Sequence, residues 1–228
     1  MLAATGDDGV AGYKARNDTA QCKYTASFPA TCPYVTSVGG TQNAENDPED
    51  HEVHTLKEWA ANAPEQQGPF FKITTAGGFS NYFARTPCQN ASVAKYMASP
   101  EAARAAAGYN TTGRGFPDVA TNSINFQIYI TSFRSLVQGT SGSSPSLGGL
   151  ISAANAARKK AGKKAKFGWI APLMYANPGV MNDVSHGYNN CTAVVAFCCG
   201  DIGFTGRTGW DPLVGLGSPS YLRLTNLM

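Results

Sequence analysis

The stretch Gly139-Thr140-Ser141-Gly142-Ser143-Ser144-Pro145 stands between an apolar, strand-like run and a helical segment of small residues. A glycine-lined turn before a helix presents one hydroxyl, that of Ser141, to the outward-pointing N–H groups and the positive dipole end of the helix, which favour negative charge. Pro145 is expected in the first turn of that helix, where its missing N–H costs little. Ser141 is therefore a candidate nucleophile, although such a cluster by itself is more often an ordinary loop.

Apolar segments alternate with alanine-rich segments on either side of this turn. Candidate strands are residues 1–5, 34–38, 126–130 and 135–139, and candidate helices are residues 91–97 and 147–158. The alternation favours an α/β fold with a largely parallel sheet flanked by helices. Active sites in such folds gather where the C-terminal ends of strands lead into helices, and residues 6–9 and 139–145 both lie at that kind of junction.

The composition is that of an ordinary globular protein. The 228 residues are 43% hydrophobic and 14% charged, with a net charge of +3, which fits one domain over residues 1–228. A basic run over residues 158–166 follows an apolar helical segment, so it is expected to be a solvated helix end rather than a nucleic-acid site. No run of about 18 apolar residues occurs, so no membrane span is expected.

Cysteines and glycosylation sequences together indicate an oxidising, glycosylating route. The six cysteines are Cys22, Cys32, Cys88, Cys191, Cys198 and Cys199, and the Asn-x-Ser/Thr acceptors are Asn17, Asn90, Asn110 and Asn190. Disulfide connectivity cannot be read from the sequence. Zinc bound by Cys191, Cys198, Cys199 and His186 is a competing explanation, but adjacent cysteines do not match the paired spacing of structural zinc sites.

Several motifs fall in a fixed order along the chain. They are Gly6-Asp7-Asp8-Gly9, Gly139-Thr140-Ser141 with Pro145, Asn182-Asp183-Val184, Gly209-Trp210-Asp211-Pro212 and Gly215-Leu216-Gly217, with residues 33–41, 77–81 and 113–120 between them. This order resembles the sedolisin family of serine-carboxyl peptidases, and within it the tripeptidyl-peptidase members. The resemblance implies a subtilisin-like sheet and peptide or protein substrates, with tripeptides released from peptide N-termini at acidic pH.

The resemblance implies that Ser141 is the nucleophile and that Asp7 helps to form the oxyanion hole. A carboxylate only accepts hydrogen bonds, so Asp7 can stabilise an oxyanion only when it is protonated and donates one. A Glu in place of His as general base also suits low pH, because its pKa lies closer to an acidic working pH. Both features point to a lysosomal or secreted protein that works in an acidic compartment. Without the resemblance, Asp7 would be read as a turn-capping aspartate.

The C-terminal motifs resemble the calcium site of the same family. By position, Asp183 and Asp211 would supply the carboxylates, and the main-chain carbonyls of Val184, Arg207 and Gly209 would complete the set around one structural Ca²⁺. These ligands are all oxygens, as a hard cation requires. The family usually has a small residue where Arg207 stands, so a nearby positive charge could weaken the site. Without the resemblance, residues 209–212 would be a turn and Asp183 a helix cap.

The family's general-base Glu and its Asp partner lie four residues apart in a segment that precedes every motif seen here. The resemblance therefore implies that this chain is the C-terminal half of a catalytic domain, and that the N-terminal half, the prodomain and the signal peptide lie outside it. Glu45 and Glu49 are internal substitutes of little weight, because Pro48 interrupts them. Alone, the chain is expected to hydrolyse peptides very poorly, because an unactivated serine hydroxyl is a weak nucleophile.

Two other interpretations stay open. A subtilisin-like peptidase with a histidine base would use His51 or His54, which precede Ser141 but lie in a polar segment, residues 42–67, expected to be an exposed loop leading into a short helix around Trp59. Subtilisins also use Asn where this chain has Asp7. The second interpretation is a glycosylated, calcium-stabilised fragment or pseudoenzyme that binds peptides or a partner without cleaving them, which the absence of a base supports.

Overall fold

The computed structural model describes residues 1–42, 59–61, 72–105, 107–163, 166–194, 197–200 and 202–227. Its strands are β1 (Leu2–Ala4), β2 (Thr36–Gln42), β3 (Trp59–Ala60), β4 (Gly78–Ala84), β5 (Gly113–Phe116), β6 (Val119–Asn122), β7 (Phe126–Ile130), β8 (Phe133–Val137), β9 (Met181–Asn182) and β10 (Ser218–Pro219). Its α-helices are α1 (Asn90–Met97), α2 (Pro100–Arg104), α3 (Thr140–Lys160), α4 (Ile170–Ala176) and α5 (Tyr221–Thr225). Short 3-10 helices cover Tyr13–Arg16, Thr19–Gln21, Pro87–Gln89 and Pro178–Val180.

The central sheet is built on β2. This strand pairs in parallel with β1 on one side and with β6 on the other, so that Ala3 stands opposite Ser37 and Val38 opposite Val119. The short β3 pairs with the last two residues of β2 in the antiparallel sense. Every residue of β2 is buried, as expected of a strand covered on both faces. The predicted α/β fold with a parallel central sheet is therefore confirmed.

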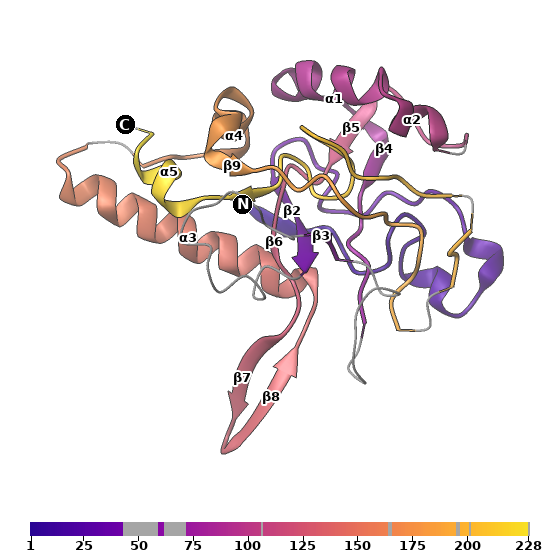
Figure 1. The fold of residues 1–228 in the computed structure, drawn as a ribbon, viewed down its shortest axis with the longest axis horizontal. Coiled ribbons are helices and arrows are strands. Elements are labelled where there is room, and N and C mark those ends of the chain that lie inside the picture. The colour runs from indigo at the N-terminus through magenta and orange to yellow at the C-terminus, as the bar shows by residue number, and fades with distance from the viewer. Residues whose placement is uncertain are drawn as a thin grey trace.

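Helix α3 covers this sheet and contacts β1, β2 and β6 along its length (Figure 1). Its small residues allow close approach, while Leu147 and Ala154 are fully buried in the same hydrophobic core as Val38. Helix α5 also packs against α3, and its Leu224 is buried in the same core. Burying a leucine side chain contributes about 2 kcal/mol, so this face fixes the position of the helix and of the turn that precedes it.

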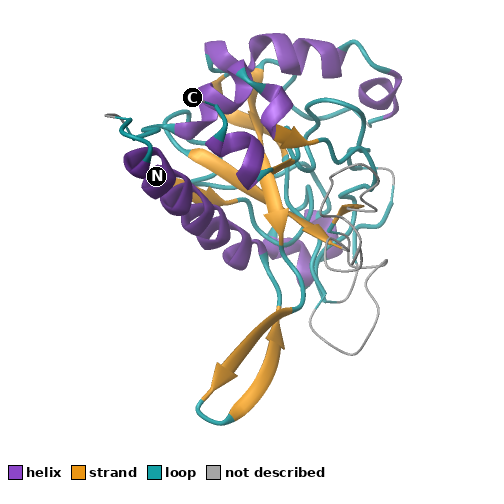
Figure 2. Ribbon diagram, turned by 60° about the vertical axis from the view of Figure 1, so that its left-hand side comes forward, coloured by secondary structure: helices purple, strands orange, loops and turns teal. Residues whose placement is uncertain are grey.

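The predicted strands at residues 126–130 and 135–139 do not join the parallel sheet. They form an antiparallel hairpin, β7–β8, in which Phe126 stands opposite Val137, and this hairpin projects from the body of the molecule (Figures 1 and 2). Only Thr131 and Ser132 separate the two strands, whereas parallel strands need a crossover of about a dozen residues. The parallel assignment was wrong for that reason.

Two further predictions of local structure need correction. Helix α3 begins at Thr140, so Pro145 lies inside the helix and not in its first turn. Because proline has no N–H, the helix lacks the hydrogen bond from residue 145 to the carbonyl of Ser141. Trp59 lies in β3 and not in a short helix. The helices predicted at residues 91–97 and 147–158 are confirmed, and the basic run does coincide with the end of α3, whose last turn carries Arg158, Lys159 and Lys160.

Of two disulfides in the described residues, one ties the C-terminal loops to the N-terminal part of the chain and the other lies within those loops. Cys22 pairs with Cys198, 176 residues away, and Cys191 pairs with Cys199. All three cysteines of the competing zinc site are therefore disulfide-bonded, so that explanation is wrong. The described residues contain no group of three or more His, Cys, Asp or Glu side chains placed to hold a metal ion. None of the described helices combines the length and the apolar character needed to cross a bilayer.

Candidate functional site

The loop after β1 and the turn before α3 meet through one threonine. The Oδ1 atom of Asp7 accepts hydrogen bonds from the backbone N–H and the hydroxyl of Thr140, at 2.8 and 3.0 Å. The same hydroxyl accepts a hydrogen bond from the N–H of Gly6, at 3.1 Å. Residues more than 130 positions apart are thus fixed side by side, at the C-terminal end of β1 and the N-terminus of α3. Thr140 was not singled out from the sequence.

Burial raises the pKa of Asp7 above its ordinary value, and the neighbouring Asp8 raises it further. The two hydrogen bonds from Thr140 and the charge of Arg16 oppose this rise without cancelling it. The other carboxyl oxygen, Oδ2, makes no hydrogen bond within the described residues. It lies close to Gly139, where a Cβ would approach it to 3.2 Å. A glycine before Thr140 therefore leaves room for the Oδ2 atom of Asp7.

Ser141 is exposed at the start of α3, immediately after Thr140. Its hydroxyl makes no hydrogen bond with any described residue, so no base contacts it in this part of the chain. The next residue, Gly142, packs under the ring of Phe126 from β7, and a Cβ there would overlap the ring. The hairpin thus has a structural role: its first residue closes over the turn that presents Ser141.

A cavity of about 170 Å³ opens on the other side of Asp7. Its lining includes Asp8, Tyr13 and Ser27. Asp8 is buried and forms an ion pair with Arg16 at 2.6 Å, and its carboxylate also accepts a hydrogen bond from the N–H of Ala193. Arg16 in turn lies over the ring of Tyr13, 4.8 Å from its centre. The cavity wall is therefore a fixed polar network rather than a loose loop.

The second pair of candidate carboxylates lies among the C-terminal loops. Asp211 is fully buried, and its oxygens accept hydrogen bonds from the N–H groups of Arg207, Leu213 and Val214 at 2.9 to 3.1 Å. Burial nevertheless raises the pKa of Asp211 to about 7, and the nearby charge of Asp183 adds to the rise. A bound cation would offset the negative charge of Asp183 that raises the pKa of Asp211.

The other residues of the predicted calcium site are also compatible with a bound cation. Asp183 accepts a hydrogen bond from the N–H of Gly209 at 2.8 Å, which brings the two loops together. Within the described residues, the carbonyls of Val184, Arg207 and Gly209 accept no hydrogen bond. The Arg207 guanidinium donates to the carbonyls of Lys95 and Thr208, although its charge still lowers the pKa of Asp183 against the rise caused by burial. The donors are all oxygens, so these residues fit a hard cation.

Several residues considered from the sequence lie outside the described part of the structure. These are Glu45 and Glu49, the internal substitutes for a base, and His51 and His54, the histidines of the subtilisin-like alternative. The predicted exposed loop over residues 42–67 lies largely outside it as well. His186 is exposed, and the cysteines that were its proposed zinc partners are bonded to other cysteines.

Comparison with curated proteins finds peptidases. No protein-family model matches the chain. Tripeptidyl-peptidase sed1 of Aspergillus fumigatus is 31% identical over 246 residues, covering 100% of this chain and 35% of that protein. Physarolisin of Physarum polycephalum is 33% identical over 98% of this chain and 40% of its own length. Tripeptidyl-peptidase 1 of Macaca fascicularis is 31% identical over 97% of this chain and 36% of its own length. The chain thus spans 35 to 40% of the length of these relatives.

Comparison with solved structures agrees on the fold. Pseudomonas sedolisin, a serine-carboxyl proteinase solved with two molecules of pseudo-iodotyrostatin, matches with a TM-score of 0.64 and 21% identity. The match covers 99% of this chain and 54% of that one. At this identity the likeness concerns the fold alone. The parallel sheet and flanking helices described above are similar to those of that structure.

Proposed function

Since this chain is homologous to a C-terminal portion of the sedolisin family of serine-carboxyl peptidases, we propose that it carries the nucleophile and the oxyanion-binding group of such a peptidase. Ser141 is the nucleophile and Asp7 is the oxyanion donor. The observation that carries this proposal is the pair of hydrogen bonds from Thr140 to the Asp7 carboxyl, whose pKa is raised. Thr140 immediately precedes the exposed Ser141 at the start of α3.

In the proposed reaction, the Ser141 oxygen attacks the carbonyl carbon of a peptide bond, and negative charge develops on the carbonyl oxygen. Neutral Asp7 donates a hydrogen bond from Oδ2 to that oxygen, while Thr140 holds Oδ1 in place. The N-terminus of α3 favours the same negative charge. Removing one donor of this kind costs about 10²–10³-fold in rate, so the position of Asp7 is worth several kcal/mol.

The raised pKa of Asp7 sets the direction of the pH dependence. The donor function exists only while the carboxyl is protonated, so activity is lost as the pH rises through the pKa of Asp7. We propose an acidic working pH, at which this carboxyl is protonated. Two disulfides in the described residues support an oxidising route, so the proposed location is a lysosome-like compartment or an acidic extracellular medium.

The proton of Ser141 must go to a base, and the described residues provide none in contact with it. We assign that role to a Glu, with an Asp partner, on a segment that precedes this sequence in the longer peptidase. We propose that the cavity beside Asp7 takes a substrate side chain. Release of tripeptides from free N-termini is the specificity proposed, as the names of the tripeptidyl-peptidase relatives suggest.

We further propose one structural calcium ion at Asp183 and Asp211, with the carbonyls of Val184, Arg207 and Gly209. Bound there, Ca²⁺ would neutralise the two carboxylates and stabilise the C-terminal loops. Gly215 and Gly217 pass so close to Asp118 and Asn182 that a Cβ would overlap backbone atoms, so these loops are packed directly on the residue that precedes β6 and on β9.

One observation favours a second function. Because the Ser141 hydroxyl contacts no base among the described residues, the chain alone could bind peptides without cleaving them. The two functions differ in what the upstream sequence adds. In a pseudoenzyme, joining the upstream segment changes nothing, whereas in the peptidase it supplies the missing base.

The test is release of tripeptides from an unblocked peptide at pH 4.5 and at pH 7. It uses this chain alone and the same chain joined to its upstream sequence, with the Ser141→Ala form of the longer protein as control. Activity only in the longer protein, and only at acidic pH, supports the peptidase. No activity in either form supports the peptide-binding alternative, and activity that peaks at neutral pH supports the histidine-dependent one.

A further inference from the structure

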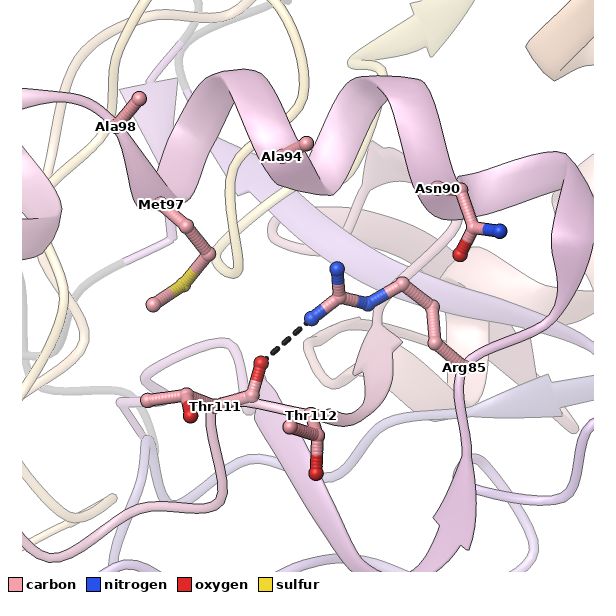
Figure 3. Close-up of a pocket in the computed structure, with 7 residues that line it drawn as sticks. All are labelled: Arg85, Asn90, Ala94, Met97, Ala98, Thr111 and Thr112. Carbon is pink, nitrogen blue, oxygen red and sulfur yellow. Dashed lines mark hydrogen bonds between the residues drawn. The ribbon is translucent and has the colours of Figure 1, made fainter.

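A groove on the far side of the molecule from α3 has no part in the proposed reaction. It has a volume of about 530 Å³, within the range of ligand-binding sites, and lies between α1 and the turn before β5. Asn90, Ala94, Met97 and Ala98 recur at helical spacing and form one wall. Figure 3 shows Asn90 at one end of this wall and Met97 with Ala98 at the other, facing Thr111 and Thr112. From Asn90 to Ala98 the helical rise makes this wall about 12 Å long.

Arg85 supplies the polar centre of the groove. Its guanidinium reaches between the helix and the Thr111 turn and donates one hydrogen bond to the carbonyl of Thr111, at 2.6 Å (Figure 3). Its Nε–H group is buried and has no hydrogen-bond partner among the residues that the structure describes. A buried donor without a partner costs about 1–3 kcal/mol, so a rearrangement of the Arg85 side chain that brings this group to an acceptor would be favoured. The apolar wall beside it favours a ligand that also presents C–H groups.

Asn90 begins a glycosylation sequence, Asn90-Ala91-Ser92, and differs from two of the other three acceptors. The Nδ2 atom of Asn110 donates to the carbonyl of Ser80, and that of Asn190 donates to the carbonyl of Gly200. The Asn90 side chain is exposed and makes no hydrogen bond within the described residues. Asn17 shares this freedom, but it does not line the groove.

We propose that Asn90 carries an N-linked glycan whose first sugars lie along the groove over α1 and accept a hydrogen bond from Arg85. An N-acetylated sugar fits both requirements, because its acetamido oxygen is an acceptor and its methyl group and ring C–H groups are apolar. The glycan starts at one end of the groove and the apolar wall continues from that point toward Met97 and Ala98. Its occupant is therefore attached to the groove itself.

The modification is a group transfer from an oligosaccharide linked to a polyisoprenoid pyrophosphate. Asn90 Nδ2 bonds to the anomeric carbon as the bond from that carbon to the pyrophosphate oxygen breaks. The lipid pyrophosphate leaves with the bonding electrons, and the amide releases one of its two protons. Nothing is oxidised or reduced. The proposal rests on the secretory route inferred from the disulfides and does not depend on the peptidase activity.

The experiment uses the full protein secreted from a eukaryotic host. Peptide mass spectrometry should find a glycan on Asn90. Because ordered packing in the groove stabilises the fold, Asn90→Gln and Ser92→Ala should each lower Tm by about 2–4 °C, whereas Asn17→Gln should leave it unchanged. Ser92→Thr keeps the glycosylation sequence and should behave as the unmodified sequence does. If a variant is not secreted, enzymatic removal of the glycan from the folded protein provides the same comparison.

Arg85→Met tests the contact, since the loss of Tm caused by Ser92→Ala should shrink to less than half in that background. The Asn90 glycan should also be removed from the folded protein more slowly than the Asn17 glycan. A glycan on Asn17 with none on Asn90 overturns the proposal, as does a Tm that is the same with and without the Asn90 glycan. Absence of glycan at every site overturns it together with the secretory route, while peptide cleavage remains separately measurable.

Discussion

Asp7 and Asp211 are both aspartates whose burial raises the pKa, yet their surroundings differ. Asp7 uses one oxygen to accept both hydrogen bonds from Thr140 and keeps the other free beside a cavity. Asp211 uses both oxygens for backbone N–H groups, is fully buried, and lies near a second carboxylate, Asp183. The same shift therefore has two meanings. At Asp7 it favours a neutral donor, and at Asp211 it marks negative charge that a cation can offset.

The largest expected effect separates the Asp7 region from everything else. In the longer protein, Ser141→Ala removes the attacking oxygen, so turnover should fall about 10⁶-fold, as it does when the nucleophile of a serine peptidase is deleted. Thermal unfolding should be unchanged, because the Ser141 side chain is exposed and makes no contact that folding requires. Turnover and melting of the purified variant check both points. Retained turnover would remove Ser141 from the mechanism.

The next effect tests whether Asp7 is a donor. Asp7→Ala removes the carboxyl group and should lower kcat about 10²–10³-fold at acidic pH, because one oxyanion donor is lost. The KM should change much less, since the interaction forms with the developing charge. Steady-state kinetics with the same unblocked peptide measure both constants. A kcat within a factor of two of the unmodified protein would leave Asp7 as a turn-capping residue only.

Calcium should act at the other carboxylate. A ligand present at about 100 times its Kd adds roughly 2.7 kcal/mol to stability, so chelation should lower Tm and Asp183→Asn should remove the dependence. Without calcium, a raised pKa means that stability is fully present below the unfolded value and is lost as the pH rises through about 7 for Asp211. Calcium should therefore stabilise more at pH 7 than at pH 4.5. Equal melting curves with calcium and with chelator would contradict the site.

The smallest effect probes the link between the two loops of the Asp7 region. Thr140→Val keeps the shape but removes the hydroxyl that bonds to Asp7 and Gly6, at a cost of about 1–3 kcal/mol. Thr140→Ser keeps the hydroxyl and should be nearly neutral, which makes it the matched control. Urea unfolding gives both values. Equal stability for the valine and serine variants would show that the link has no energetic weight.

The sequence predicted the parts of the site that depend on residue type. Residues 6–9 and residues 139–145 were expected at strand ends that lead to a helix, and the structure brings them into contact. The role of Thr140 escaped prediction, because a threonine next to a candidate nucleophile carries no sign of which distant carboxylate it bonds. The cavity beside Asp7 escaped for the same reason, since its lining comes from loops whose path depends on tertiary packing.

The errors in the fold have local causes. Residues 126–130 were correctly predicted as a strand, but the direction of its partner was set by Thr131 and Ser132, which carry none of the usual glycine or asparagine signals of a tight turn. The start of α3 was placed too late because Pro145 is typical of a first helical turn, whereas here a proline within the helix is tolerated. Disulfide pairing depends on the fold, so it could be known only from the structure.

The most direct test of the account compares kcat/KM against pH for the longer protein and its Asp7→Asn variant. An asparagine side chain donates a hydrogen bond at every pH, whereas Asp7 donates only when protonated. The account predicts that the unmodified protein loses activity as the pH rises through the pKa of Asp7, and that the variant does not show this loss. Two profiles that fall in parallel would contradict the claim that Asp7 acts as a protonated donor beside Ser141.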